Sequence, residues 1–226
     1  MTTVAVESAR TGGCVRAPKL RADASRNRER IVLAARDAFV EHGADVPLDE
    51  IAKRAGVGNA TLYRNFPDRV ALIREVALLA KNRILALAEA ATVEADAVDG
   101  NGPFEALQRF AHAAVEEKVG GLSAVFTSAV HPDDPELTEI RVRLQAAVSG
   151  LMERARTAGE LRPDVDHGDL FIAISQMTRP LPGTSCRLIK DFGHRHLQLF
   201  LDGLRTPARS VLPGRAATFE DFCSRD

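Results

Sequence analysis

Apolar residues in this chain recur at intervals of three and four, and this spacing is the feature that most limits its fold. The first such face follows Ser25 and consists of Ile31, Ala34, Ala35, Ala38 and Phe39. The period-two alternation expected of strands is not sustained. Of the strand-favouring aromatic residues, Tyr occurs once and Trp is absent. The sequence therefore predicts an all-α fold of about nine helices.

Glycine, proline and aspartate divide the helical pattern into segments. After the helix that ends at Gly43, we expect helices at 47–55, 58–66, 67–91, 104–119, 121–130, 136–158, 167–178 and 187–204. Residues 1–24 lack periodicity and carry several basic residues, which predicts a disordered basic arm. Residues 206–226 are predicted to be a loose tail, in which Phe219 and Phe222 are candidates for docking on the body.

The net charge of −1 conceals an uneven distribution. Residues 1–83 contain 15 Lys and Arg against 10 Asp and Glu, whereas residues 84–226 contain 15 against 21. The basic half is therefore the one suited to approach phosphate. No apolar run is long enough for a membrane span or a secretory signal, which predicts a cytoplasmic protein without a membrane partner.

Residues 47–66 carry the most specific pattern. Leu48, Ile51 and Ala55 share one helical face, Gly56 suits the left-handed position that ends a helix, and a second short helix follows as far as Phe66. A short helix, a tight glycine turn and a second helix form the helix-turn-helix arrangement, in which the second helix enters the major groove of DNA.

The second of these helices carries polar groups that suit DNA. Asn59, Ala60, Thr61, Tyr63 and Arg64 are expected to face outward, where their side chains can reach base edges and phosphates. We expect Arg69, just inside the next helix, to add a phosphate contact.

These residues resemble those of the TetR/AcrR-type transcriptional regulators. The resemblance covers about residues 26–85 and rests on the Ala-Gly-Val turn, the Leu62-Tyr63 pair, Phe66 and the basic Arg69. It implies that Tyr63 and Arg69 bind phosphates and that Thr61 and its neighbours read the groove. Two departures are Gly58, where the family often has Ser or Thr, and Val46-Pro47, which lacks a side-chain oxygen cap.

The resemblance also implies how the whole chain is organised. Residues 25–85 would form the DNA-binding domain, and residues 86–205 an effector-binding and dimerisation domain. A homodimer would then bind a palindromic operator in double-stranded DNA, and a small-molecule effector of unknown identity would release it, which predicts a ligand-responsive repressor without a cofactor or metal.

The C-terminal half offers candidates for both of its expected roles. Residues proposed for an effector pocket are Phe104, Phe110, His112, Phe126, Met152, Phe171, Ser175, Gln176, Met177 and Arg179. The same aromatic and Met residues, at helical spacing, also suit an ordinary core. Residues proposed for the dimer interface, on two broad apolar faces, are Leu170, Ile174, Leu188, Phe192, Leu197, Phe200 and Leu201.

The sequence leaves two other functions open. A small helical enzyme would have to use the six histidines, which show neither metal-ligand spacing nor a nucleophile motif. A thiol-based redox sensor would use Cys186, since the widely spaced Cys14, Cys186 and Cys223 are expected to be free thiols.

Overall fold

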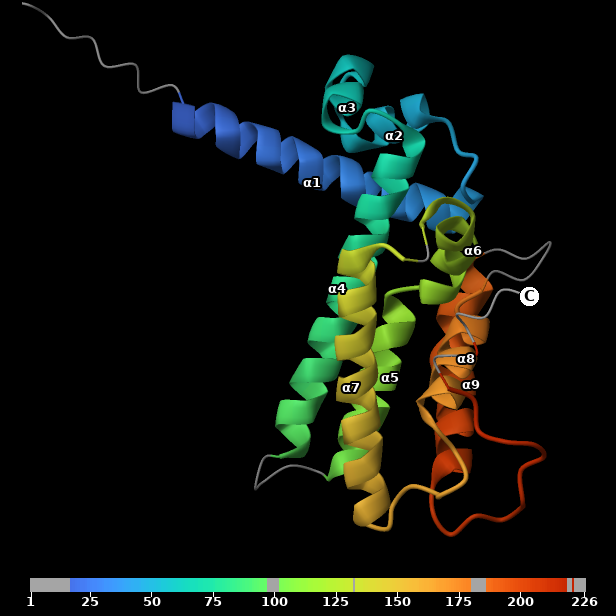
Figure 1. Ribbon diagram of the computed structural model, residues 1–226. Coiled ribbons are helices and arrows are strands. Elements are labelled where there is room, and N and C mark those ends of the chain that lie inside the picture. Colours follow the sequence, from blue (N-terminus) through green and yellow to red (C-terminus); the bar gives the residue numbers. More distant parts are fainter. Residues whose placement is uncertain (1–16, 97–101, 132, 180–185, 219–220, 222–226) are drawn as a thin grey trace, which may run out of the picture.

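The computed structural model describes residues 17–96, 102–131, 133–179, 186–218 and 221 (Figure 1). Over these residues the chain forms nine helices and no strand, which confirms the all-α prediction. The helices are α1 (Ala17–His42), α2 (Leu48–Ala55), α3 (Asn59–Asn65), α4 (Arg69–Ala95), α5 (Pro103–Glu116), α6 (Val119–Ala129), α7 (Pro135–Thr157), α8 (His167–Met177) and α9 (Cys186–Leu204). Within the same ranges, no helix has the length and hydropathy to cross a membrane.

Two apolar cores organise the molecule. The N-terminal core joins α1 to α4 and includes the fully buried Phe39, Leu62 and Phe66. The C-terminal core joins α4, α5 and α7–α9. Helix α4 contributes to both, and α6 adds Leu122 and Val125 to the N-terminal core. Figure 1 shows α2 and α3 at one end of the molecule, with α4, α5 and α7 side by side beneath them and α8 antiparallel to α9.

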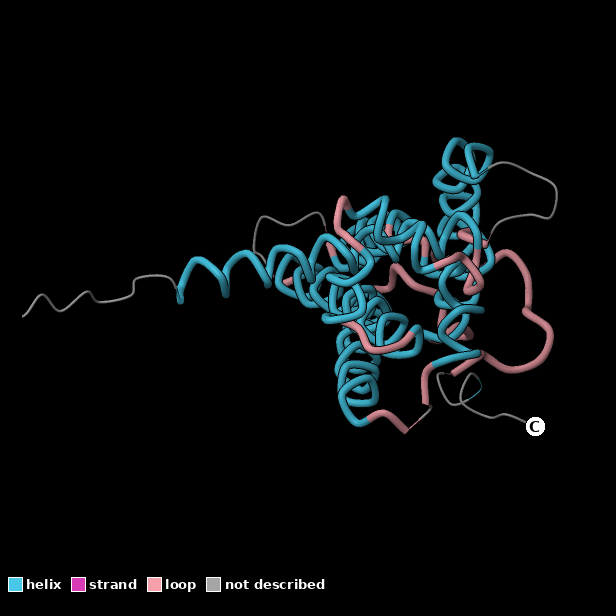
Figure 2. The backbone as a smooth tube through the Cα atoms, turned by 90° about the horizontal axis from the view of Figure 1, so that it is seen from above, coloured by secondary structure: helices cyan, strands magenta, loops and turns pink. Residues whose placement is uncertain are grey.

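Helix α1 begins at Ala17, so the prediction of disorder is wrong for residues 17–24. Pro18 lies in the first turn, where its missing N–H costs nothing, and the Lys, Leu, Arg and Ala residues after it favour a helix. This part of α1 projects from the body (Figures 1 and 2), and therefore it needs no apolar face and shows no periodicity. Residues 1–16 lie outside the described part of the chain.

The expected break at Gly120-Gly121 is also wrong. The chain turns instead at Glu117 and Lys118, the latter with φ of +52°, and both glycines lie in the first turn of α6. A Cβ atom on Gly120 would lie 1.9 Å from the carbonyl oxygen of Ser175, and the Gly120 N–H donates to Thr178 Oγ1 at 2.7 Å. Gly120 is therefore needed where α6 crosses the end of α8.

The C-terminal segment is not loose where it is described. Arg162 donates to the carbonyl oxygen of Ser210 at 2.7 Å, and the Ala217 N–H donates to Asp169 Oδ1 at 3.1 Å at the start of α8. A Cβ atom on Gly168 would lie 2.2 Å from the Ala217 carbonyl oxygen, so the segment docks closely on α8. The predicted docking residues Phe219 and Phe222 lie outside the described residues.

Candidate DNA interface

The turn between α2 and α3 forms as the sequence predicts. Gly56 has φ of +64°, and the Val57 N–H donates to the Ala52 carbonyl oxygen at 3.0 Å. Neither Pro47 nor Gly58 supplies a side-chain cap to the helix that follows it. Asn59 Nδ2 instead donates to Asp49 Oδ1 at 2.9 Å and ties the start of α3 to α2.

Helix α3 has one buried side and one exposed side. Leu62 and Phe66 are each 1% exposed, whereas Tyr63 is 50% exposed. Asn59, Ala60 and Arg64 are also exposed, and Thr61 is half-buried. The structure therefore gathers the sequence-predicted residues of α3 on a single outer face, with Thr61 at its edge.

Arg64 lies along its own helix. Its Nε donates to the Ala60 carbonyl oxygen at 3.0 Å, and its Nη2 donates to Thr61 Oγ1 at 3.1 Å. These contacts are exposed to solvent and cost little to exchange. The Arg64 guanidinium can therefore turn toward DNA without disturbing the buried side of α3.

Arg69 begins α4, as the sequence predicts, and its side chain makes contacts within the protein that the sequence does not indicate. It is half-buried, and its Nη1 donates to the carbonyl oxygens of Ala44 at 2.6 Å and Val46 at 2.7 Å. These oxygens belong to the connection between α1 and α2. Arg69 thus holds that connection against the start of α4, which is a structural role that sequence reasoning missed.

Arg28 on α1 holds the other end of α3. Its Nη1 donates to the Asn65 carbonyl oxygen at 3.2 Å, its Nη2 donates to Glu75 Oε2 at 2.7 Å, and its guanidinium carbon lies 4.5 Å from the centroid of the Phe66 ring. The positive charge also complements the C-terminal end of the α3 dipole. No local pattern in the sequence marks Arg28, because its three partners lie far from it along the chain.

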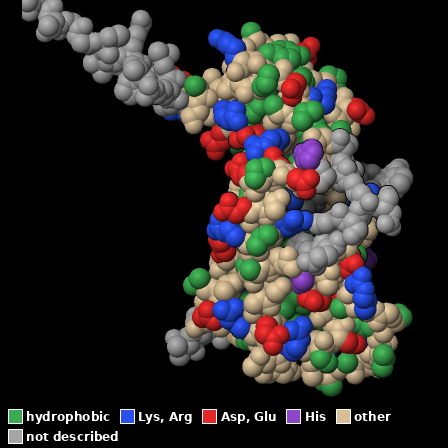
Figure 3. Space-filling model, viewed as in Figure 1, with side chains coloured by type: hydrophobic (Ala, Val, Ile, Leu, Met, Phe, Trp, Pro, Cys, Tyr) green, Lys and Arg blue, Asp and Glu red, His purple; other side chains and the backbone are tan. Residues whose placement is uncertain are grey.

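The charged side chains around this interface are partly paired. Arg54 on α2 donates to Glu41 on α1 at 2.6 Å, and this hydrogen bond lowers the pKa of the Glu41 carboxyl below its ordinary value. Figure 3 shows Lys and Arg side chains interspersed with Asp and Glu side chains, both at the end of the molecule that carries α2 and α3 and over the helical body. The cationic side chains at the α2/α3 end are of the kind that can bind phosphate.

The residues predicted for an effector pocket lie partly in the C-terminal core, partly at its edge and partly on the surface. Phe104, Phe110 and Met152 lie in the C-terminal core and are at most 2% exposed. Phe171 and Met177 pack on the edge of that core, and Phe126 packs against both cores. Four residues complete the set: Ser175 is half-buried, Gln176 and Arg179 are exposed, and His112 bonds to His194 and Gln198 of α9.

The prediction for the dimer interface is wrong for four residues. Leu170, Ile174, Leu197 and Leu201 are at most 1% exposed and belong to the C-terminal core of their own chain. Phe192 is 48% exposed and Phe200 is half-buried, while the Leu188 side chain lies outside the described residues. Where the side chains of α8 and α9 are described, the exposed large apolar residues are Ile172, Phe192 and Leu199.

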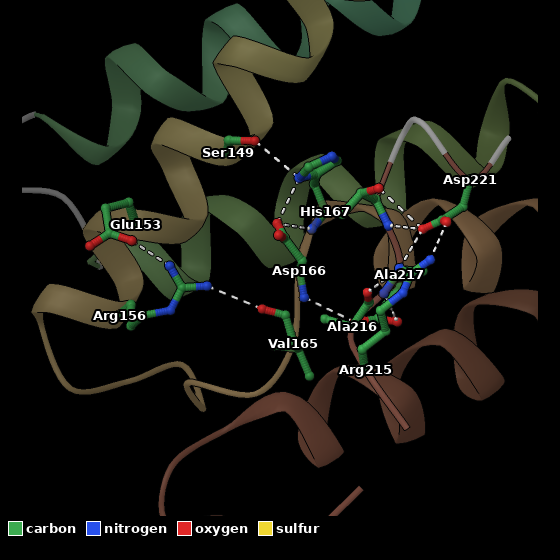
Figure 4. Close-up of polar contacts among 12 residues, drawn as sticks. Ser149, Glu153, Arg156, Val165, Asp166, His167, Arg215, Ala216, Ala217 and Asp221 are labelled. Atoms are coloured by element: carbon green, nitrogen blue, oxygen red, sulfur yellow. Dashed lines mark hydrogen bonds and ion pairs between the residues drawn. The ribbon is translucent and has the colours of Figure 1, made fainter. Parts of the chain in front are cut away.

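The alternative functions find little support in the geometry. In the described part of the chain, no group of three or more His, Cys, Asp or Glu is placed to hold a metal ion. Ser149 and Asp166 both contact the same atom of His167, Nδ1, at 3.2 Å and 2.6 Å (Figure 4). A Ser–His–Asp catalytic triad needs opposite ring nitrogens, so these three residues are not one. The side chains of Cys14, Cys186 and Cys223 lie outside the described residues.

Comparison with known proteins assigns both halves of the chain. A family model described as bacterial regulatory proteins, tetR family, matches residues 31–76. A second model, described as transcriptional regulator SbtR-like, C-terminal domain, matches residues 102–206. No curated protein matches the chain.

Solved structures agree with these matches. A TetR transcriptional regulator from Streptomyces coelicolor is 31% identical, with 80% of this chain and 99% of that chain covered and a TM-score of 0.57. A TetR transcription regulatory protein from Mycobacterium vanbaalenii is 32% identical, with 83% and 99% covered and a TM-score of 0.56. LfrR from Mycobacterium smegmatis, solved in complex with proflavine, is 23% identical, with 84% and 99% covered and a TM-score of 0.62.

Proposed function

The chain belongs to the TetR family of DNA-binding transcriptional regulators, and from this premise we propose that it is a ligand-responsive repressor that binds a palindromic operator as a homodimer. The observation that carries the proposal is the division of α3 into a side that is buried at Leu62, next to the buried Phe66 that follows the helix, and an exposed polar side with Tyr63 and Arg64. A helix of this kind, exposed at the end of the molecule, is suited to the major groove.

In this proposal the six residues predicted from the sequence contact DNA. Tyr63 and Arg69 bind phosphates, and the remaining residues contact base edges: Asn59, Ala60, Thr61 and Arg64. Arg69 would bind phosphate with donors other than Nη1, since that atom bonds Ala44 and Val46. The proposal places the protein in the cytoplasm, where its DNA partner lies.

Selection of DNA fragments from a random pool by the purified protein tests this function. The expected product is an inverted repeat whose half-sites lie about 34–36 Å apart, the spacing of two symmetric recognition helices. Tyr63→Phe should weaken binding to all selected sequences, whereas Arg64→Ala should relax the preference at one position of each half-site. Selection of no common sequence would contradict the proposal.

The proposed dimer uses the outer faces of α8 and α9. Ile172, Phe192 and Leu199 are 39%, 48% and 63% exposed, and burial against a second copy would remove this apolar surface from water. Leu199→Lys should convert the dimer to a monomer in sedimentation experiments. Val142→Lys is the matched control, because Val142 is a 57% exposed residue on α7, outside the proposed interface.

The proposed effector site lies within the C-terminal core, beside Phe110 and Met152. LfrR was solved with bound proflavine, but at 23% identity it resembles this chain in fold only. The proposal therefore rests on the apolar side chains of this chain. A ligand that binds there and displaces the end of α4 would change the separation of the two α3 helices and release the operator. Equal operator affinities with and without a bound ligand would contradict the switch.

A further inference from the structure

A row of polar side chains lies between α5 and α9. The α5 residues Gln108, His112 and Glu116 are each four positions apart, as are the α9 residues His194, Gln198 and Asp202. Side chains at this spacing share a helical face, and the two sets meet between the antiparallel helices. The row has no part in the proposed DNA interface or dimer face.

The amide orientations in this row are determined by neighbouring charges. Arg205 Nη2, a donor, lies 3.5 Å from Gln108 Oε1, so the Gln108 amide nitrogen faces α9 and donates to Gln198 Oε1 at 2.7 Å. Gln198 Nε2 in turn donates to Asp202 Oδ1 at 2.8 Å, and a carboxylate can only accept. Gln198 therefore presents its carbonyl oxygen, an acceptor, toward α5.

These orientations determine the tautomers of the two histidines. His112 Nε2 lies 3.0 Å from Gln198 Oε1, and His194 Nε2 lies against Glu116 Oε1. Since both oxygens are acceptors, both Nε2 atoms must carry a hydrogen. A neutral imidazole has only one N–H, and each neutral ring would therefore have a bare lone pair on Nδ1.

The two Nδ1 atoms face each other at 2.9 Å. The ring centroids are 5.1 Å apart with planes inclined by 24°, so the rings meet edge to edge and the lone pairs oppose one another. We propose that His112 and His194 share one proton between their Nδ1 atoms, so that the pair carries a positive charge and fastens α9 to α5 only while that proton is bound. A zinc ion, with Zn–N bonds of about 2.0–2.1 Å, would not fit between nitrogens placed head-on at this distance.

The charges around the pair favour this arrangement. Glu116 supplies the opposite charge at His194, and Asp202 lies beyond Gln198. On α8, which packs against both helices, Asp169 bonds to Ala217 and His167 contacts Asp166. Several other charged groups of α4, α5 and α7 form ion pairs away from the two histidines: Glu105 with Arg205, Arg109 with Glu94, Arg143 with Glu89, Arg154 with Asp96, Arg74 with Asp134, and Arg83 with Glu117.

Loss of the shared proton has a consequence that rests on the proposed function. Opposed lone pairs would separate the rings, and α9 would lose its charged attachment to α5, leaving the Gln108–Gln198 hydrogen bond as a neutral one. Helix α9 also carries Phe192 and Leu199 of the proposed dimer face. Dimer formation, and with it operator binding, should therefore weaken as the pH rises through the range in which histidines lose their charge, about pH 5 to 8.

A double-mutant cycle on the full chain tests the shared proton without reference to DNA. His112→Ala, His194→Ala and the double variant are unfolded in denaturant at about pH 5 and about pH 8. At the lower pH, the coupling between the two histidines should raise the folded-to-unfolded ratio about three- to tenfold. At the higher pH, this coupling should be lost. The control is His196→Ala, since His196 is exposed and bonds only within α9, to the Phe192 carbonyl oxygen.

Equal coupling at both pH values would overturn the proposal, because a neutral N–H···N hydrogen bond would not be lost. Nitrogen NMR of the unmodified chain provides a second readout: both Nε2 atoms should be protonated at about pH 5, with a single proton shared by the Nδ1 atoms. Stabilisation of the unmodified chain, but not His194→Ala, by added Zn²⁺ would instead assign the pair to a metal and reject the shared proton.

Discussion

Arg36 on α1 forms a 2.9 Å ion pair with Glu117 at the corner between α5 and α6, and its side chain is only 11% exposed. Arg36 also donates to the Glu117 carbonyl oxygen at 3.0 Å, and Arg83 on α4 lies 3.6 Å from the same carboxylate. The corner of the C-terminal core is thereby attached to the first helix of the DNA-binding domain. Displacement of the corner would be transmitted directly to α1.

Glu117→Gln should destabilise the protein. The change leaves the Arg36 guanidinium largely buried beside a neutral partner, and we expect a loss of about 1–3 kcal/mol in the free energy of unfolding. Denaturant unfolding measures the loss. Glu94→Gln is the control, because Glu94 forms an exposed pair with Arg109 and should cost less than about 1 kcal/mol. Equal effects of the two changes would show that the buried ion pair contributes no more to the free energy of unfolding than the exposed one.

Arg28→Gln should reduce operator affinity although Arg28 is not assigned a DNA contact. Helix α3 is too short to be stable alone, so its orientation depends on attachments such as those of Arg28 to Asn65 and Phe66. We expect a loss of about three- to tenfold in affinity, measured by titration of the selected operator. Arg26→Gln, which removes an exposed pair with Asp23, should change the affinity less.

Arg69→Ala and Arg64→Ala should differ in their effect on stability. Arg69 bonds two carbonyl oxygens of the connection before α2, so its loss should lower both the unfolding temperature and operator affinity. Arg64 bonds only within α3, and its loss should leave the unfolding temperature nearly unchanged. Unchanged DNA binding by Arg69→Ala at low salt would remove Arg69 from the proposed phosphate contacts.

Gly120→Ala should be strongly destabilising. The added Cβ would meet the backbone oxygen of Ser175 at 1.9 Å, and backbone cannot move aside as a side chain can. We expect a loss of about 2 kcal/mol or more in thermal or denaturant unfolding. Gly203→Ala is the matched control, because a Cβ on this α9 residue meets nothing within 4 Å. It should be neutral or stabilising, since alanine favours a helix.

Asp134 should contribute stability that is lost in acid. Hydrogen bonding from Arg74 lowers the pKa of Asp134 below its ordinary value, with help from the Leu137 N–H at the start of α7. A carboxyl group whose pKa is lower in the folded state stabilises the protein at pH values above its unfolded-state pKa of about 3.9. This stabilisation is lost as the pH falls through the folded-state pKa. The stability difference between the unmodified chain and Asp134→Asn should therefore shrink below about pH 4. A difference that is constant down to about pH 2 would exclude this charge effect.

The helices were predictable where local residues determine them. Gly43, Gly56 and Pro67 interrupt the apolar spacing, and α1, α2 and α3 end at or near them. The same spacing predicts that Leu170 and Leu197 are buried, but it does not show what covers them. The sequence favours a second subunit, whereas the structure buries both residues in the core of their own chain. Apolar periodicity identifies a face and not its partner.

The remaining features depend on contacts between distant residues. Arg28 meets Glu75 across 47 positions, and His112 meets His194 across 82. In the sequence, Gly120 looks like an ordinary helix-ending glycine. Only the structure shows that it lies against the Ser175 backbone of α8. Such contacts leave no periodic signal, and only the tertiary arrangement reveals them.

The contribution of Leu122 and Val125 to the N-terminal core limits how this regulator can be divided. Both side chains come from α6, are at most 2% exposed, and lie among residues of α1–α4. A fragment that stops after α4 would lack part of its own interior and would present apolar surface to water. Recognition domains exchanged between such regulators would need a matching α6, so that specificity and response are inherited together.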